Sequence, residues 1–242
     1  MHTLNIDPWF LDKAKQSREG RLNAHEAVEA KKTALVVVDM QNYFVAEGMP
    51  SYVPEAKTIV PNINRLARAM RASGGSVVWI QTEARIADPR DWSNRKESMS
   101  NTGWTRRQTL LARTGAGFPI FPTCEVLAED SIAIKYRYSA FIPHPSELDS
   151  LLRARGIDTL LITGTTTSTC CESTARDAAN WDYRTIMVSD GTADHTDAEH
   201  NHTLGKFLQT FGDVQSTDEL IAKLEGTGKT AGRASRAAGL AA

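Results

Sequence analysis

The sequence predicts an α/β protein: a doubly wound, three-layer α/β/α architecture around a mostly parallel sheet of about six strands. Two observations lead to this fold class. The apolar segments "TALVVVD" and "SVVWIQT" are continuous rather than alternating, which is typical of strands buried on both faces of a parallel sheet. Such segments alternate with helical patterns along the chain, as they do in an open sheet covered by helices.

Strands are expected at 33–39, 76–82, 131–135, 158–164, 184–190 and, as a short sixth strand, 213–215. Helices are expected at 55–73, 145–156, 170–182, 197–212 and 217–225. Pro61 either dents the first of these helices or delays its start. Residues 83–130 are predicted to be mostly irregular, because they contain several prolines and the polar run "DWSNRKESMSN".

The length of 242 residues and the hydrophobic content of 41% suit one domain with a substantial core. We expect a polar N-terminal arm at 1–32, the main domain at 33–225, and a flexible tail of small and polar residues at 226–242. The tail contains "GTGKT", but Lys223 stands where a phosphate-binding loop requires its first glycine.

The composition argues against several classes of protein. The net charge is −1 and no basic block is present, so neither nucleic acid nor an anionic membrane is an expected partner. No apolar run is long enough to span a bilayer, and the N-terminus has no signal-peptide pattern. Three cysteines are too few for a disulfide framework, and they predict a cytoplasmic location.

Three reactive side chains lie at the ends of predicted strands: Asp39 and Lys135 end two of them, and Cys170 follows the end of a third after a short loop. Taken singly, each has a commoner structural role, as a cap, a solvated edge residue or a buried thiol. The carboxyl ends of parallel strands meet at one edge of the sheet, where ligands bind in folds of this kind. We therefore predict that an acid, a base and a thiol form one catalytic site.

The sequence around Cys170 predicts a reactive thiol. "TCCE" fits a capping box with Thr169 as the N-cap and Glu172 three residues later. Cys170 would then begin a helix, where unpaired N–H groups favour a thiolate and can hold an oxyanion. Cys171 lies about 100° further round the helix and is predicted to pack in the core rather than to form a redox pair. The preceding "TTTST" suits a tight turn with inward N–H groups, or else a solvated loop.

Three blocks of sequence, "ALVVVDMQNYF", "IKYRYSAF" and "LLITGTTTSTCCESTARDA", resemble the isochorismatase-like cysteine hydrolases over residues 33–225. The second block is most similar to the ureido- and carbamoyl-amide hydrolases of that family. The resemblance implies hydrolysis of a C–N bond in a small amide, ureide or carbamoyl compound, with release of ammonia through a thioester. It also implies that no cofactor or metal is used and that the protein is a homodimer or homotetramer.

The resemblance assigns roles to the predicted site residues. Asp39 would accept the thiol proton of Cys170, with Lys135 favouring the ionised partners. Backbone N–H groups near Thr166 and Cys170 would hold the oxyanion, and a cis peptide bond would join Thr165 to Thr166. Substrate contacts are expected from Gln41, Phe44, Gln81, Trp92, Trp104, Arg137, Phe141 and His195.

Some of these contacts have an alternative role. Gln41 is expected to support Asp39 or the substrate, and it fits equally well as a core amide bonded to backbone. Arg137 either binds a carboxylate or pairs with an acid as scaffold. Trp92 and Trp104 belong to a segment that we expect to fold over the site as a lid. The histidines at 195, 200 and 202 are expected at the surface, with His195 the nearest to a ligand.

Other activities within and outside the family remain as alternatives. Nicotinamidases hold a metal through Asp and two His after the second strand, but this chain has no histidine between His25 and His144. Members that cleave isochorismate lack the cysteine. A binding protein without turnover would not need all three triad residues. A nucleotide-binding fold would require glycines in the turn "DMQNYFVAEG" that are not there.

Overall fold

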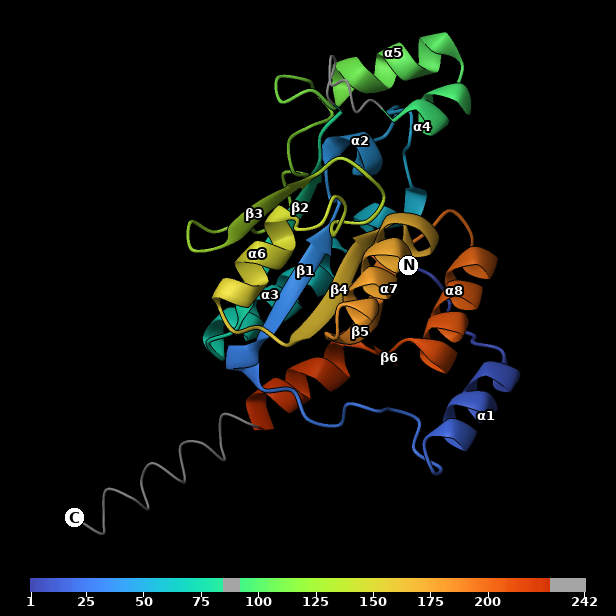
Figure 1. Ribbon diagram of the computed structural model, residues 1–242, viewed down its shortest axis with the longest axis vertical. Coiled ribbons are helices and arrows are strands. Elements are labelled where there is room, and N and C mark those ends of the chain that lie inside the picture. Colours follow the sequence, from blue (N-terminus) through green and yellow to red (C-terminus); the bar gives the residue numbers. More distant parts are fainter. Residues whose placement is uncertain (85–91, 227–242) are drawn as a thin grey trace, which may run out of the picture.

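The computed structural model describes residues 1–84 and 92–226, and over these it contains one parallel sheet with strand order β3-β2-β1-β4-β5-β6 (Figure 1). The strands are β1 (Thr33–Val38), β2 (Ser76–Thr82), β3 (Ser131–Lys135), β4 (Thr159–Thr165), β5 (Arg184–Ala193) and β6 (Asp213–Gln215). The predicted fold class and all six predicted strands are confirmed, although β5 continues beyond its predicted end.

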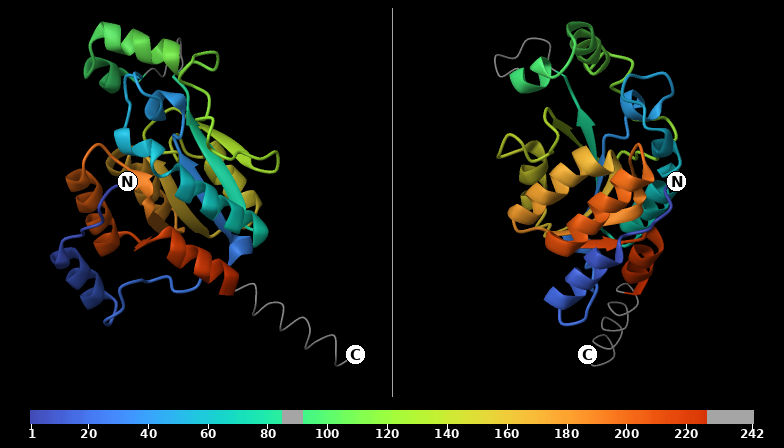
Figure 2. Two further views of the ribbon diagram at one scale, coloured as in Figure 1. Left: turned by 180° about the vertical axis from the view of Figure 1, so that it is seen from behind. Right: turned by 90° about the vertical axis from the view of Figure 1, so that its right-hand side faces the viewer.

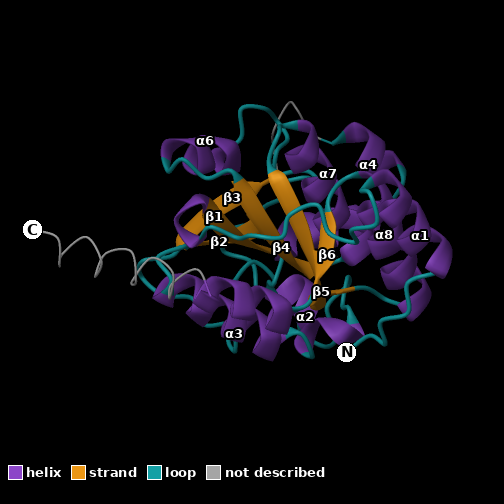
Figure 3. Cartoon of the chain, turned by 90° about the horizontal axis from the view of Figure 1, so that it is seen from below, coloured by secondary structure: helices purple, strands orange, loops and turns teal. Residues whose placement is uncertain are grey.

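Helices cover both faces of the sheet. One face is covered by α3 (Val60–Ala72) and the helical residues 217–226; the other is covered by α6 (Glu147–Ala154), α7 (Glu172–Asn180) and α8 (Asp197–Thr210) (Figure 3). In β1, Leu35 and Val37 pack toward α3, while Val36 and Val38 pack toward the opposite layer. Both faces of this strand are therefore apolar, which explains its continuous hydrophobic sequence.

The predicted helix at 55–73 is divided. A 3₁₀ turn (Pro54–Lys57) comes first, and α3 begins at Val60 with Pro61 in its first turn. Proline is tolerated there because the first N–H groups of a helix have no intrahelical partner. Of the two expected effects of Pro61, the structure thus shows the late start.

The N-terminal residues pack against the main domain. Helix α1 (Pro8–Ser17) lies along α8, and a Cβ atom at Gly205 would come within 2.4 Å of the Phe10 ring. Arg18 then pairs with the buried Asp213 at 2.9 Å. The expected arm is therefore tied to α8 and β6. The predicted tail, 226–242, lies outside the described residues beyond Gly226.

The prediction that residues 83–130 are mostly irregular is wrong for two segments. Helices α4 (Ser93–Glu97) and α5 (Asn101–Leu110) lie beyond the carboxyl ends of the strands (Figures 1 and 2). The sequence of α5 has no apolar stripe. Its helix begins instead at a local cap, where Ser100 Oγ accepts a hydrogen bond from Gly103 N–H at 3.1 Å. Within the described ranges, no helix is long and apolar enough to cross a membrane.

The strand order reverses between β1 and β4, which places a switch point of the sheet between them. Gly164, near the end of β4, has a φ of +108°. A Cβ atom there would lie 2.0 Å from the carbonyl oxygen of Val38, so only glycine allows the two strand ends to approach this closely. This approach brings the residues that follow β1 and β4 together.

Candidate active site

Asp39, Lys135 and Cys170 form one buried cluster at this switch point. The Lys135 Nζ atom lies 2.8 Å from Asp39 Oδ2 and 3.5 Å from Cys170 Sγ, and it donates to the Arg137 carbonyl at 3.0 Å. The three side chains belong to residues that are 0%, 2% and 8% exposed. Lys135 is the last residue of the edge strand β3. Its side chain is long enough for the ammonium to reach across β2 to Asp39 at the end of β1. The structure thus brings the predicted acid, base and thiol together.

The carboxylate of Asp39 is held from the end of β2. Its Oδ1 accepts a hydrogen bond from Thr82 Oγ1 at 2.8 Å. The backbone N–H of Thr82 donates to Gln41 Oε1 at 2.7 Å, and Gln41 Nε2 donates to the Phe118 carbonyl at 2.7 Å. Gln41 is therefore a buried amide bonded to backbone, and it supports Asp39 through Thr82; both roles were expected.

Cys170 lies in a π turn rather than at the first position of a helix. The turn spans Thr167–Cys171, and the N–H of Cys171 donates to the carbonyl of Thr166, five residues back, at 3.1 Å. The predicted capping box is wrong, because Glu172 pairs with Arg176 at the start of α7 instead of closing back on Thr169. A single wide turn of this kind is frequent at functional sites but has no simple sequence signature.

The residues before this turn agree with the resemblance. A cis peptide bond joins Thr165 to Thr166, as the family implied. Thr165, the last residue of β4, and Thr167 are fully buried, and the other residues of "TTTST" are partly buried, so the loop is a tight turn rather than an exposed, solvated one.

Burial dominates the electrostatics of the thiol. It raises the pKa of Cys170 to about 12; Lys135 opposes this rise and Asp39 adds to it. For Lys135, burial alone lowers the pKa, but the charges of Asp39 and Cys170 outweigh it and the net pKa is raised. Burial therefore favours a protonated Cys170 thiol beside the Lys135 ammonium. The expectation of a resting thiolate is wrong, because Cys170 is desolvated and does not begin a helix.

The pH dependence of alkylation should show this protonated thiol. Only the thiolate reacts, so with a pKa of about 12 the rate at Cys170 should rise with pH. We expect a rise of about tenfold per pH unit between about pH 7 and 10, with no plateau. Mass spectrometry after iodoacetamide treatment, in a Cys171→Ala background, measures this rate. A plateau below about pH 8 would instead reveal a stable thiolate.

Cys171 has the packing role predicted for it. It is 0% exposed, and its Sγ lies 3.7 Å from the carbonyl oxygen of Thr163 inside the sheet layer. Burial raises the pKa of this thiol well above its ordinary value. Both adjacent cysteines are free thiols in the structure.

A cavity of about 70 Å³ opens above Cys170. This is room for several water molecules, each of which needs about 10–15 Å³, and it favours a small substrate. Phe44, Trp92 and Arg137 were expected there and do line it. The other lining residues include several that the sequence did not indicate, namely Tyr43, Ser51, Thr82, Arg95, Arg107 and Tyr138.

The remaining expected substrate contacts lie elsewhere. Gln81 Nε2 donates to the Phe118 carbonyl at 2.9 Å, and Phe141 packs in the core against a tyrosine ring. Trp104 is buried within α5, and His195 is exposed at the surface before α8. None of these four is among the residues that line the cavity.

The histidine cluster is only partly at the surface. His195 and His202 are exposed, as predicted, but His200 is 1% exposed, and its prediction as a surface residue is wrong. His200 lies on the face of α8 that packs toward the π turn that contains Cys170. The sequence alone did not show which face of the helix His200 occupies. In the described parts of the chain, no group of His, Cys, Asp or Glu side chains is arranged to hold a metal ion.

Arginines give the cavity a positive wall. Arg107 lies 5.9 Å from the ring centroids of both Trp92 and Trp104, and Arg137 lies 5.2 Å from that of Trp92. Burial lowers the pKa of Arg107, but a guanidinium remains charged at neutral pH. None of the described residues lining the cavity is acidic, so the wall suits an anionic group.

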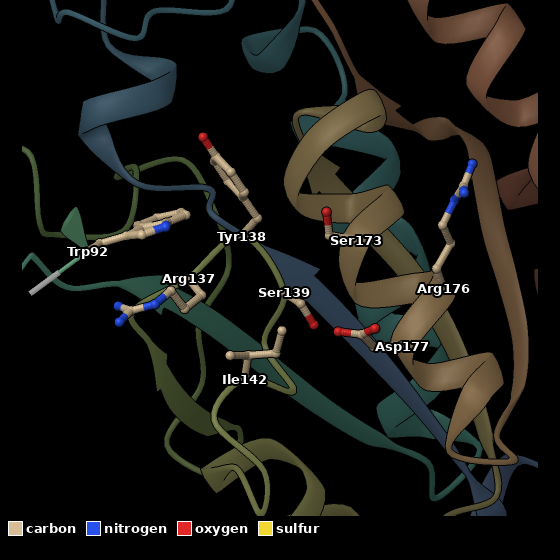
Figure 4. Close-up of a pocket in the computed structure, with 8 residues that line it drawn as sticks. All are labelled: Trp92, Arg137, Tyr138, Ser139, Ile142, Ser173, Arg176 and Asp177. Carbon is tan, nitrogen blue, oxygen red and sulfur yellow. The ribbon is translucent and has the colours of Figure 1, made fainter. Parts of the chain in front are cut away.

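A larger groove of about 410 Å³ lies next to this cavity (Figure 4). Trp92, Arg137 and Tyr138 line both spaces. In Figure 4, Ser173 and Asp177 project from α7 on the other side of the groove. Trp92, Arg137 and Tyr138 therefore border both the catalytic cavity and the groove.

An α/β/α fold with a parallel sheet, and with a buried thiol, carboxylate and ammonium at the switch point of that sheet, defines a cysteine hydrolase. Residues 33–219 match the isochorismatase domain model, and the chain belongs to this family. It is 37% identical over 182 residues to a ureidoacrylate amidohydrolase of Methylorubrum extorquens, covering 69% of this chain and 71% of the relative. A second ureidoacrylate amidohydrolase, from Variovorax paradoxus, is 32% identical and covers 81% and 82% respectively.

Solved structures agree with this assignment. A cysteine hydrolase from Pseudomonas syringae pv. phaseolicola superposes with a TM-score of 0.76 at 28% identity, covering 84% of this chain and 97% of that one. An N-carbamoylsarcosine amidase from Thermoplasma acidophilum has a TM-score of 0.62 at 29% identity, covering 77% and 97%. The predicted family, fold and class of enzyme are thereby confirmed.

Proposed function

We propose that the protein hydrolyses a C–N bond in a small ureido or carbamoyl compound that carries a carboxylate. The observation that carries this proposal is the Lys135 ammonium, buried 2.8 Å from Asp39 and 3.5 Å from Cys170. The names of the relatives, ureidoacrylate amidohydrolase and N-carbamoylsarcosine amidase, support the bond type. The arginines of the cavity wall support the carboxylate.

The first half of the reaction forms a thioester. Asp39 takes the thiol proton as Cys170 Sγ attacks the carbonyl carbon, and Lys135 stabilises the charges that develop on both partners. The C–N bond then breaks, and the departing nitrogen receives the proton from Asp39. Because Cys170 is protonated before attack, the carboxylate beside it is required in this step.

The second half releases the acyl group. Asp39 removes a proton from water, the hydroxide attacks the thioester, and the proton returns to sulfur. A carbamoyl group leaves as carbamate, which decomposes to carbon dioxide and ammonia, whereas a simple amide releases ammonia in the first half. The backbone N–H groups of Thr166 and Cys170 are the proposed oxyanion donors, each typically worth about 3 kcal/mol.

Arg107 is the proposed anchor for the substrate carboxylate. Replacing it by alanine should raise KM about 10- to 100-fold with a smaller change in kcat, because a charge-assisted bond contributes about 1.5–3 kcal/mol. Steady-state kinetics of ammonia release measure the effect. The neighbouring Arg106 is exposed on the same helix, so Arg106→Ala serves as the control and should match wild type. An unchanged KM in Arg107→Ala would remove this role.

A substrate screen tests the proposed function directly. Ureido acids, N-carbamoyl amino acids and simple amides are incubated with the protein, and ammonia is measured with and without a chelator. We expect the carboxylate-bearing ureido or carbamoyl compounds to react fastest and the chelator to have no effect. Loss of activity with the chelator would favour the metal-dependent nicotinamidase alternative. No turnover of any compound would favour a binding protein.

We also propose that the protein works in the cytoplasm as a homodimer or homotetramer. Three free cysteines support a reducing compartment, and the family resemblance supports the assembly. Sedimentation analysis of the purified protein tests the oligomeric state, and a monomer at micromolar concentration would contradict it.

A further inference from the structure

The N-terminal residues pack close to the π turn (Thr167–Cys171) that contains Cys170. The side chain of His2 is only 3% exposed. Its Nε2 lies 2.9 Å from the backbone nitrogen of Asp194, and its Nδ1 lies 2.6 Å from Asp197 Oδ1. The ring stacks on His200, with centroids 4.4 Å apart and planes 22° apart. His2 is thus packed against α8 and against Asp194, which follows the end of β5.

Two of these partners bond directly to the turn that carries Cys170. His200 Nδ1 lies 2.9 Å from Thr167 Oγ1, and the Ser168 N–H donates to Asp194 Oδ2 at 2.6 Å. His200, Asp194 and Thr167 are at most 1% exposed. Burial lowers the pKa of His200 to about 4, so the ring is neutral at physiological pH. Neither histidine, nor Asp194, lines the substrate cavity.

We propose that His2, His200 and Asp194 form a positioning network that holds the π turn, and with it Cys170, in its reactive geometry. Backbone N–H groups of the turn donate to the carbonyl of Thr166. The network binds the first two residues of the turn, Thr167 and Ser168. Displacing a catalytic atom by about 1 Å can lower a rate by about 10²-fold, so the network acts on kcat rather than on substrate affinity. The test of this network by ammonia release rests on the proposed function, whereas the test by alkylation of Cys170 does not.

Two substitutions each remove one side-chain group of the network. His2→Ala removes the ring that stacks on His200 and bonds to Asp194 and Asp197, and Thr167→Val removes the hydroxyl at nearly constant volume. Thr167→Ser keeps the hydroxyl and is the conservative rescue. His202→Ala is the matched control, because His202 is exposed on the same helix and contacts Phe10 of α1 rather than the turn.

We measure kcat and KM for ammonia release, the iodoacetamide reactivity of Cys170 in a Cys171→Ala background, and the melting temperature. His2→Ala and Thr167→Val should lower kcat about tenfold at unchanged KM and slow alkylation several-fold. Thr167→Ser and His202→Ala should stay within about twofold of the parent. All variants should retain a cooperative melting transition.

Several results would overturn the network. Unchanged kcat and alkylation in both His2→Ala and Thr167→Val would do so, as would an equal loss in the His202→Ala control, which would indicate general packing. If the parent protein releases no ammonia from any ureido or carbamoyl compound, the proposed function fails, but the alkylation rates still decide whether the network positions the thiol.

Discussion

Replacement of Cys170 by alanine is expected to lower kcat for ammonia release by about 10⁴-fold or more, because no other side chain can form the thioester. The thiol is the only one whose sulfur lies beside both Lys135 and the cavity among the described residues. Steady-state ammonia release at saturating substrate measures the loss, and an unchanged melting temperature shows that the variant is folded.

The adjacent thiol provides the control. Cys171→Ala should keep most of the activity, since Cys171 faces the carbonyl of Thr163 inside the core and not the cavity. Removing a buried sulfur still leaves a small void, so its stability should fall by about 1–2 kcal/mol. Equal loss of turnover in both variants would mean that the two cysteines act as a pair, and the assignment of a single nucleophile would be wrong.

Asp39→Asn should lower kcat about 10³- to 10⁴-fold, because asparagine cannot take the thiol proton. It should also lower the free energy of unfolding by about 3–5 kcal/mol, since Lys135 would be left as a buried charge without its partner. Kinetics of ammonia release and urea denaturation measure the two effects on the same samples.

A double variant separates catalysis from stability. Adding Lys135→Met to Asp39→Asn removes the unpaired ammonium while keeping a side chain of similar length. Stability should recover by a few kcal/mol, whereas activity should stay lost. If activity returned together with stability, Asp39 would be a structural partner of Lys135 and not the proton acceptor.

The strands and the catalytic cluster could be predicted because their signals are local. A strand buried on both faces must be apolar throughout, so β1 and β2 appear as continuous runs in the sequence. Asp39 and Lys135 follow directly from the ends of their strands, and a parallel sheet places such ends on one edge. The capping box failed for the opposite reason. The four residues "TCCE" fit the start of a helix, but hydrogen bonds from Thr169 and Cys171 to the carbonyl of Thr166 determine the backbone of the π turn.

Residues that approach the site from distant segments could not be predicted. Arg107 lies on α5, whose sequence shows no periodicity, and it reaches the cavity because that helix packs beyond the carboxyl ends of the strands. His2 is separated from its partner His200 by nearly the whole chain. No pattern within a short window contains either contact.

By itself, the sequence determined the α/β fold, the strand positions, the family and the three residues of the catalytic cluster, because each depends on hydrophobic pattern, chain order or a short motif. Tertiary structure decided the protonation of the Cys170 thiol, the position of the arginines that line the cavity, and the packing of His2 on His200 next to the π turn. These depend on burial and on distances between remote segments, and both quantities exist only once the chain has packed.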